Sequence, residues 1–243
     1  MGLFDFLTGG SPEKQLAKHG ARIRKKDATA EDRQASAYWL AEQGTTPSIV
    51  ALLGRFEMTY EHHMKDVAEK DMVAQLVLEL GPVSIDALKH FLKKCKNFAR
   101  PLDLLKQLAG AEAALEMVLS LIEAEAAKSE LKPDKKRELL IVLAEFKDAR
   151  SMDVAIELLE DFDEGVRYAA AEVLIALEDN ETLQVALLAA LANPEEESNR
   201  LRVRIAEIVG GRSWPLGPHA DSLTSNPPVG WAVSGGLLSQ TTN

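Results

Sequence analysis

The chain has 243 residues, enough to bury a substantial core either as one extended domain or as two compact ones. Hydrophobic residues make up 46% and charged residues 27%, as in ordinary folded soluble proteins, and the low aromatic content of 5% with abundant Leu, Ala and Val favours helix. The net charge of -10 argues against nucleic-acid binding, which depends on clustered Lys and Arg that neutralise phosphates.

Two absences suggest where the protein acts. No run approaches the roughly 18 consecutive apolar residues of a membrane-spanning helix, and the N-terminus lacks a basic region followed by an apolar core of signal-peptide length. The single cysteine, Cys95, cannot form an internal disulfide. We therefore expect a cytoplasmic protein without stable membrane insertion.

The first segment, residues 1–11, carries an apolar cluster of Leu3, Phe4, Phe6 and Leu7. Position 6 is Phe rather than Ser or Thr, so the pattern for N-myristoylation fails. An apolar stretch this short gives weak membrane affinity by itself. We expect the segment to cap the first helices, with a weak membrane contact as the alternative.

Helical periodicity dominates residues 12–209, where short amphipathic segments alternate with breaks at Gly, Pro or Asp. Helices are expected over residues 31–43, 48–56, 66–80, 85–98, 102–108, 111–127, 134–146, 152–159, 164–177, 181–191 and 197–209. Short helices with one apolar face and almost no long loops can bury those faces only by stacking on their sequence neighbours. The pattern therefore predicts an all-α solenoid.

The clearest repeat lies at residues 161–177, where an Asp-containing turn precedes Val-Arg, a run of Ala and a pair of Leu. Partial echoes occur at residues 199–206 and 134–140. Three arginines, Arg137, Arg167 and Arg204, recur at spacings compatible with helical repeats whose turns vary in length.

This pattern resembles the HEAT-repeat family. The order of the chain, from Gly2–Leu7 through Glu31-Asp32-Arg33 to the tryptophan after the last helix, is also similar to a group of uncharacterised bacterial HEAT-domain proteins. The resemblance implies an armadillo-like, right-handed superhelix of HEAT-like helix pairs. In HEAT proteins the arginine typically bonds an aspartate near the inter-helix turn. For this chain the resemblance therefore implies a structural bridge from Arg167 to Asp161 or Asp163.

The last segment, residues 210–243, is rich in Pro, Gly and Ser, with Trp214 and Trp231 as isolated aromatic anchors. Residues 230–239 predict a small β-hairpin with a Gly-rich turn. Because terminal repeats need caps that hide their last apolar face, we expect this tail to be a second cap.

One short cluster, Glu61-His62-His63-Met64-Lys65-Asp66, has metal-ligand character. On a helix, His62 and Asp66 would share a face. A transition-metal site needs three or four ligands, however, and the sequence shows no motif that would supply the others. A solvated turn is the favoured interpretation. The sequence shows neither a catalytic elbow around Ser, nor an activating base for Cys95, nor a phosphate-binding loop. We expect no cofactor, no metal and no catalytic residue.

Basic residues gather in two places. Lys89, Lys93, Lys96 and Arg100 fall at spacings that would align them on one face of the helix expected over 85–98 and beyond. We name these four the candidate partner-binding residues, for an acidic protein surface, and the alternative is a solvated helix face. The second group is Lys14, Lys18, Arg22, Arg24, Lys25 and Lys26.

Together these observations favour a non-catalytic scaffold or adaptor that binds protein partners through stacked helix faces. The assignment rests on analogy of fold. Two alternatives belong to other classes. The first is an enzyme similar to the phycobilin lyases of HEAT-like fold, and the second is a HEAT-like protein that binds nucleic acid, which the net charge disfavours.

Overall fold

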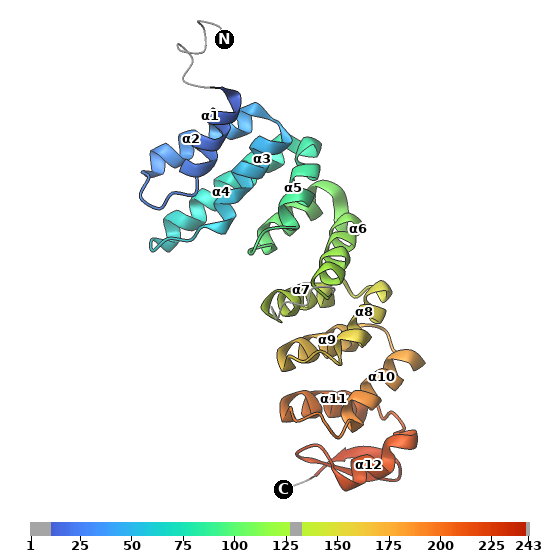
Figure 1. Cartoon of the computed structure of the whole chain (residues 1–243). Helices are drawn as coiled ribbons and strands as arrows, with labels where there is room; N and C mark the ends of the chain where they lie inside the picture. The colour runs from blue at the N-terminus through green and yellow to red at the C-terminus, as the bar shows by residue number, and fades with distance from the viewer. Residues whose placement is uncertain (1–10, 127–132, 242–243) are drawn as a thin grey trace, which may run out of the picture. The chain divides into compact units, whose positions relative to one another are not determined.

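A computed structural model describes residues 11–126 and 133–241 (Figure 1). The chain divides into two compact units, Met1–Met117 and Val118–Asn243, and each is described by itself. Apart from Ser11, the predicted N-terminal cap lies outside the described residues. None of the helices over the described ranges is long and apolar enough to cross a membrane.

The first unit is built from short helices joined by tight turns. They are α1 (Pro12–Arg22), α2 (Ala30–Gln43), α3 (Thr46–Leu53), the 3-10 helix η1 (Gly54–Glu57), α4 (His63–Leu80), η2 (Gly81–Val83), α5 (Ser84–Leu92) and the first part of α6 (Ala99–Ala126). Hydroxyl caps set three of the starts, because Ser11, Thr29 and Thr45 each accept a hydrogen bond from the main-chain N–H three residues on. Gly44 ends α2 in the left-handed conformation that glycine adopts without strain.

The core of this unit lies between α1, α2 and α3, between α3 and α5, and between α2 and α4. Its fully buried side chains include Leu40, Ile49, Leu52, Leu88 and Leu92. A non-helical residue, Gly110 (φ 89°, ψ 166°), interrupts α6 at the break that the sequence predicts between its two helices.

The second unit repeats one arrangement of paired helices. After the last part of α6 come α7 (Pro133–Phe146), η3 (Ala149–Ser151), α8 (Met152–Leu158), α9 (Glu164–Ala176), α10 (Glu181–Ala192), α11 (Asn199–Gly211), η4 (Gly217–His219), α12 (Ala220–Ser225), β1 (Trp231–Ser234) and β2 (Leu237–Gln240). Figure 1 shows α7, α9 and α11 stacked in one column and α8 and α10 in a second. The alternation of helix and turn that the sequence predicts here is confirmed.

Close packing of α9 explains the alanine run in the repeat. Ala169, Ala170 and Ala171 are all buried, and α9 contacts α7, α8, α10 and α11. Side chains of a single carbon allow helices to approach on several sides without voids or overlap. Asp163 caps the N-terminus of this helix through the Val166 N–H, and Ser198 caps α11 in the same way through the Leu201 N–H.

The predicted hairpin is confirmed and covers the end of the stack. Strands β1 and β2 pair antiparallel, with Trp231 opposite Gln240, and the turn uses Gly235 and Gly236, both at positive φ. Trp231 and Leu238 are buried, and β2 packs against α11. The hairpin thus hides the apolar face that the last helix would otherwise expose.

Candidate functional site

A basic residue occupies the fourth position of each helix in the column of α7, α9 and α11: Lys136 in α7, Arg167 in α9 and Arg202 in α11. Each side chain reaches the segment that leads into the next element. The structural repeat therefore passes through these three residues. The register that the sequence suggested, through Arg137 and Arg204, is displaced from it by one and two positions.

The most complete of these contacts belongs to Arg167. Its Nε and Nη2 atoms donate to the two carboxylate oxygens of Glu196, at 2.6 and 3.0 Å, and its Nη1 donates to the main-chain carbonyls of Asp161 and Phe162, at 2.9 and 3.1 Å. One guanidinium therefore joins the turn before its own helix to the turn before α11. The Glu196 side chain is only 5% exposed, and the Arg167 side chain is 18% exposed.

The two aspartates that the family resemblance paired with Arg167 have other partners. The Asp161 carboxylate forms an ion pair with Lys136 and accepts the Asp163 N–H at 2.9 Å. The Asp163 carboxylate accepts the Val166 N–H at 3.0 Å as the cap of α9. The carboxylate partner of Arg167 is thus Glu196, and Asp161 contributes to Arg167 only its main-chain carbonyl.

Electrostatics favour the charged forms of this pair. Burial by itself would raise the pKa of Glu196, but hydrogen bonds from Arg167 and from the Ser198 N–H outweigh it and hold the pKa below its usual range. The hydrogen bonds that Arg167 donates to Glu196 in turn raise the pKa of Arg167. Both groups are therefore charged at neutral pH.

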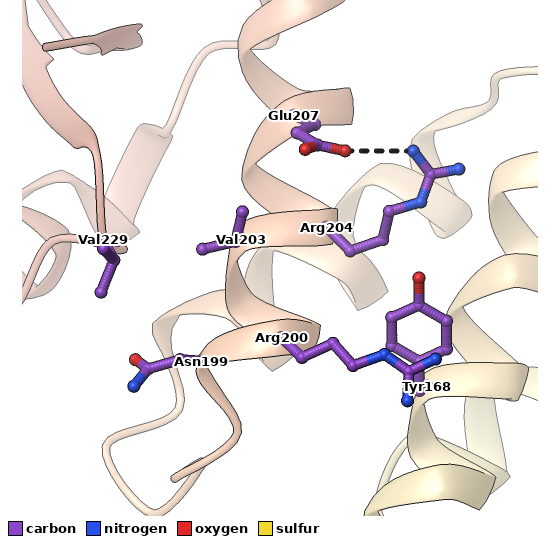
Figure 2. Close-up of a pocket in the computed structure, with 7 residues that line it drawn as sticks. All are labelled: Tyr168, Asn199, Arg200, Val203, Arg204, Glu207 and Val229. Carbon is purple, nitrogen blue, oxygen red and sulfur yellow. Dashed lines mark hydrogen bonds and ion pairs between the residues drawn. The ribbon is translucent and has the colours of Figure 1, made fainter.

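A shallow pocket opens beside α9 and α11 on the exposed side of the stack, with a volume of about 500 Å³ (Figure 2). We call it the α9–α11 pocket. It is lined by Tyr168 of α9, by Asn199, Arg200, Val203, Arg204 and Glu207 of α11, and by Val229, which precedes β1.

One of the two arginines in the pocket is fully engaged. Arg204 donates to both oxygens of the Glu172 carboxylate, at 2.5 and 3.1 Å, and to Glu207 at 3.2 Å, an interaction drawn in Figure 2. The hydrogen bonds that Arg204 donates to Glu172 are the largest cause of its raised pKa. The positive charge of Arg204 is therefore already balanced by carboxylates of the chain.

The other arginine of the pocket, Arg200, contacts an aromatic ring. The guanidinium carbon of Arg200 lies over the Tyr168 ring, 3.8 Å from its centroid, and Figure 2 shows the Arg200 side chain reaching from α11 to this ring of α9. Within the described part of the chain, no carboxylate lies within ion-pair distance of Arg200. A stacked guanidinium keeps the N–H donors at its edge available, and that edge suits bidentate recognition of a carboxylate.

The family assignment follows from comparison with known families. Residues 123–206 match the family model for HEAT repeats. This segment is a HEAT-repeat domain. No curated protein and no solved structure matches the chain.

The HEAT-repeat domain includes α7, α8, α9, α10 and the part of α11 that carries Arg200 and Arg204. The resemblance drawn from residues 161–177 is thereby confirmed. HEAT repeats stack into α-solenoids, so the predicted fold class is confirmed as well.

Outside the HEAT-repeat domain, the four candidate partner-binding residues do not share a helix. Helix α5 ends at Leu92, so Lys89 lies on α5, Lys93 is its C-terminal cap, Lys96 lies in the connection, and Arg100 lies on α6. The expectation of one basic helix face is therefore wrong. In addition, Arg100 is ion-paired with Asp71 of α4 at 2.6 Å.

A carboxylate from a distant segment binds the chain that follows the end of α5. The Glu57 side chain accepts the main-chain N–H groups of Lys96 and Asn97 at 2.9 to 3.1 Å, and the Asn97 side chain donates to the Phe56 carbonyl at 3.3 Å. Those N–H groups would bond to α5 if the helix continued. Periodicity along the local sequence does not reveal this competition.

The cluster around His62 and Asp66 is a structural one. Asp66 is buried, accepting from Arg55 and Lys70, each at 2.7 Å, so it is not the solvated residue that we expected. Its burial opposes ionisation, but the hydrogen bonds from Lys70 and Arg55 prevail and lower its pKa. Over residues 11–126 and 133–241, no three His, Cys, Asp or Glu side chains are grouped to hold a metal ion.

The same region holds a counterpart of the Arg167 contact that sequence reasoning missed. Arg33, at the fourth position of α2, donates to both oxygens of Glu69 at 2.9 and 2.8 Å, and to the Ala28 carbonyl in the turn before its own helix. Glu69 also accepts from Arg55 and from the Tyr60 hydroxyl.

A sequence signal for these contacts does exist. In three helices a capping Thr, Asp or Ser is followed four residues later by Arg, and these pairs are Thr29 with Arg33, Asp163 with Arg167, and Ser198 with Arg202. The cap starts the helix, and the fourth residue then points back over the turn that precedes it. A search for this spacing would have identified the repeated arginines.

Proposed function

We propose that the protein is a non-catalytic interaction scaffold whose HEAT-repeat domain binds an acidic segment of a protein partner in the α9–α11 pocket. The observation that carries the proposal is the unpaired, ring-stacked guanidinium of Arg200. By contrast, Arg167, Arg202 and Arg204 are already engaged in contacts within the domain or with the segment that follows it. Arg200 is exposed and has donors to offer.

Three properties of the pocket support an acidic peptide as the ligand. Tyr and Arg are the residue types that most often dominate binding energy at protein interfaces. The Tyr168 ring fixes the guanidinium plane, so less side-chain entropy is lost when a carboxylate binds. Val203 and Val229, the second of which is 65% exposed, offer an apolar surface for the neighbouring residue of the partner.

We further propose that this binding takes place in the cytoplasm, where the single buried Cys95 would stay reduced. The net charge of -10 gives the partner's acidic segment no general attraction to the chain. Selectivity would then come from the geometry around Arg200 rather than from long-range steering.

The test uses crosslinking and mass spectrometry to identify bound proteins, followed by titration of the crosslinked segment as a synthetic peptide. We expect Arg200→Glu to weaken peptide binding at least tenfold, about 1.4 kcal/mol. The matched control is Lys89→Glu, the same charge reversal on a surface of the other unit, which should bind normally. Equal affinity for the peptide in the Arg200→Glu variant would disprove this site.

A further inference from the structure

The basic residues near the N-terminus are concentrated to a degree that the rest of this acidic chain does not show. Residues 12–26 contain six Lys or Arg and a single carboxylate, Glu13. On α1, Lys14, Lys18 and Arg22 recur at four-residue spacing and therefore lie along one helix face. Lys14 and Lys18 are exposed, and Arg22 is half-buried.

This face continues into a pocket of about 730 Å³ at the end of α1. Lys18, Arg22 and Lys25 line it, together with Asp27 and Asp32. The nearest carboxylate oxygen to Arg22 belongs to Asp32, at 3.7 Å, which makes the contact a weak one between exposed groups. The three cations are therefore only partly neutralised.

The side chains between the basic residues of α1 are mostly short. The exposed row next to Lys14, Lys18 and Arg22 on α1 consists of Glu13, Ala17 and Ala21. Long basic side chains that stand above small alanines can lie flat and spread their charges toward an extended anionic surface, while their carbon stems stay close to the helix. Such a face fits a bilayer better than a single deep anion site.

We propose that the basic face of α1, together with the pocket formed by Lys18, Arg22 and Lys25, binds the surface of an anionic lipid bilayer. The net charge of -10 would repel the protein from such a surface in most orientations, so the segregated basic face selects the orientation in which α1 meets the lipid. Clusters of about four to eight Lys or Arg on an amphipathic helix are typical of binding to anionic lipid, and residues 12–26 supply six.

The experiment measures co-sedimentation of the full chain with vesicles of phosphatidylcholine alone and with vesicles that also contain phosphatidylglycerol. We expect binding only to the anionic vesicles, weakening as salt rises. The triple variant Lys18→Gln, Arg22→Gln, Lys25→Gln should bind on the order of 100-fold more weakly. The matched control, Lys89→Gln, Lys93→Gln, Lys96→Gln, removes the same charge elsewhere in the first unit and should bind as the unaltered protein does.

A second variant guards against misfolding. Lys14→Gln with Lys18→Gln changes two exposed side chains that form no ion pair with any described residue, and circular dichroism checks the fold of every variant. Arg200→Glu should bind vesicles normally, which separates this proposal from the peptide site. The proposal is overturned by equal binding to neutral vesicles, by equal losses in the two triple variants, or by binding to soluble polyglutamate or inorganic phosphate without binding to vesicles.

Discussion

The six-membered ring of Trp231 lies directly on Gly210, at a point where α11 has no side chain. A Cβ atom at position 210 would come within 2.3 Å of the ring atom Cζ3 and within 3.3 Å of the Leu238 carbonyl. Real Cβ atoms do not approach other atoms so closely, so the hairpin and the helix must separate if Gly210 acquires a side chain. The packing of the C-terminal hairpin on α11 therefore depends on the absence of a side chain at position 210.

Gly210→Ala should destabilise the protein by about 1–3 kcal/mol, the usual cost of forcing an extra carbon into a packed contact. The measurement is the free energy of unfolding in urea. Gly211→Ala is the matched control, because nothing lies within 4 Å of a Cβ there. Alanine favours helix over glycine, so this second change should be neutral or slightly stabilising. Equal effects of the two substitutions would contradict the described packing of Trp231.

Arg167→Ala should destabilise the protein by about 1–3 kcal/mol, because it leaves the buried Glu196 carboxylate without its charged partner. Arg137→Ala removes an arginine whose ion pair with Asp134 is exposed, and should cost less than about 1 kcal/mol. Adding Glu196→Gln to Arg167→Ala should recover part of the loss, since the unpaired charge is then removed. An unchanged thermal midpoint in Arg167→Ala would show that this contact does not stabilise the repeat.

The stability of the protein should depend on pH through the same carboxylate. The pKa of Glu196 lies below its ordinary value of 4.5 in the folded chain, so its contribution to stability is complete above that value and is lost as the pH falls through the folded pKa. Glu196→Gln should therefore flatten the fall in thermal midpoint as the pH drops below about 4.5. If the thermal midpoints of the unaltered protein and of Glu196→Gln fall in parallel at these pH values, Glu196 is not the group responsible.

Local sequence features predicted most of the elements. Helix boundaries in the second unit follow from apolar spacing and from caps such as Asp163, and the hairpin follows from Gly235-Gly236 between two short apolar runs. These signals act within one or two turns of chain. They could therefore be read without knowledge of the packing.

What the sequence did not predict depends on residues that are distant along the chain. Glu196 lies 29 positions after Arg167, and Glu57 lies 39 positions before Lys96, whose N–H it accepts. The stacking of Arg200 on Tyr168 likewise requires two separate helices. Helical periodicity specifies which face of a helix is buried, but it does not specify which carboxylate a neighbouring repeat brings to that face.

The last prediction compares two arginines of the first unit that form ion pairs of similar length in different surroundings. Arg55 lies 2.7 Å from Asp66 with side chains that are 1% and 4% exposed, and Arg100 lies 2.6 Å from Asp71 with side chains that are 40% and 61% exposed. Arg55 also bonds Glu69 and the Met58 carbonyl, both at 3.0 Å. Removing it leaves Asp66 with Lys70 alone and Glu69 with Arg33 and Tyr60, in a region with little water.

Arg55→Ala should therefore lower the free energy of unfolding of this unit by about 3 kcal/mol, the low end for buried pairs that lose one partner, because Lys70 and Arg33 still face the two carboxylates. Arg100→Ala should cost less than about 1 kcal/mol, because water and salt already screen its pair. Hydrogen exchange of α2 and α4, read by mass spectrometry, reports the first unit alone and should accelerate only in the Arg55→Ala variant. Similar exchange in both variants would mean that burial of the charges does not determine their contribution, and would assign Arg55 the same small role as a surface arginine.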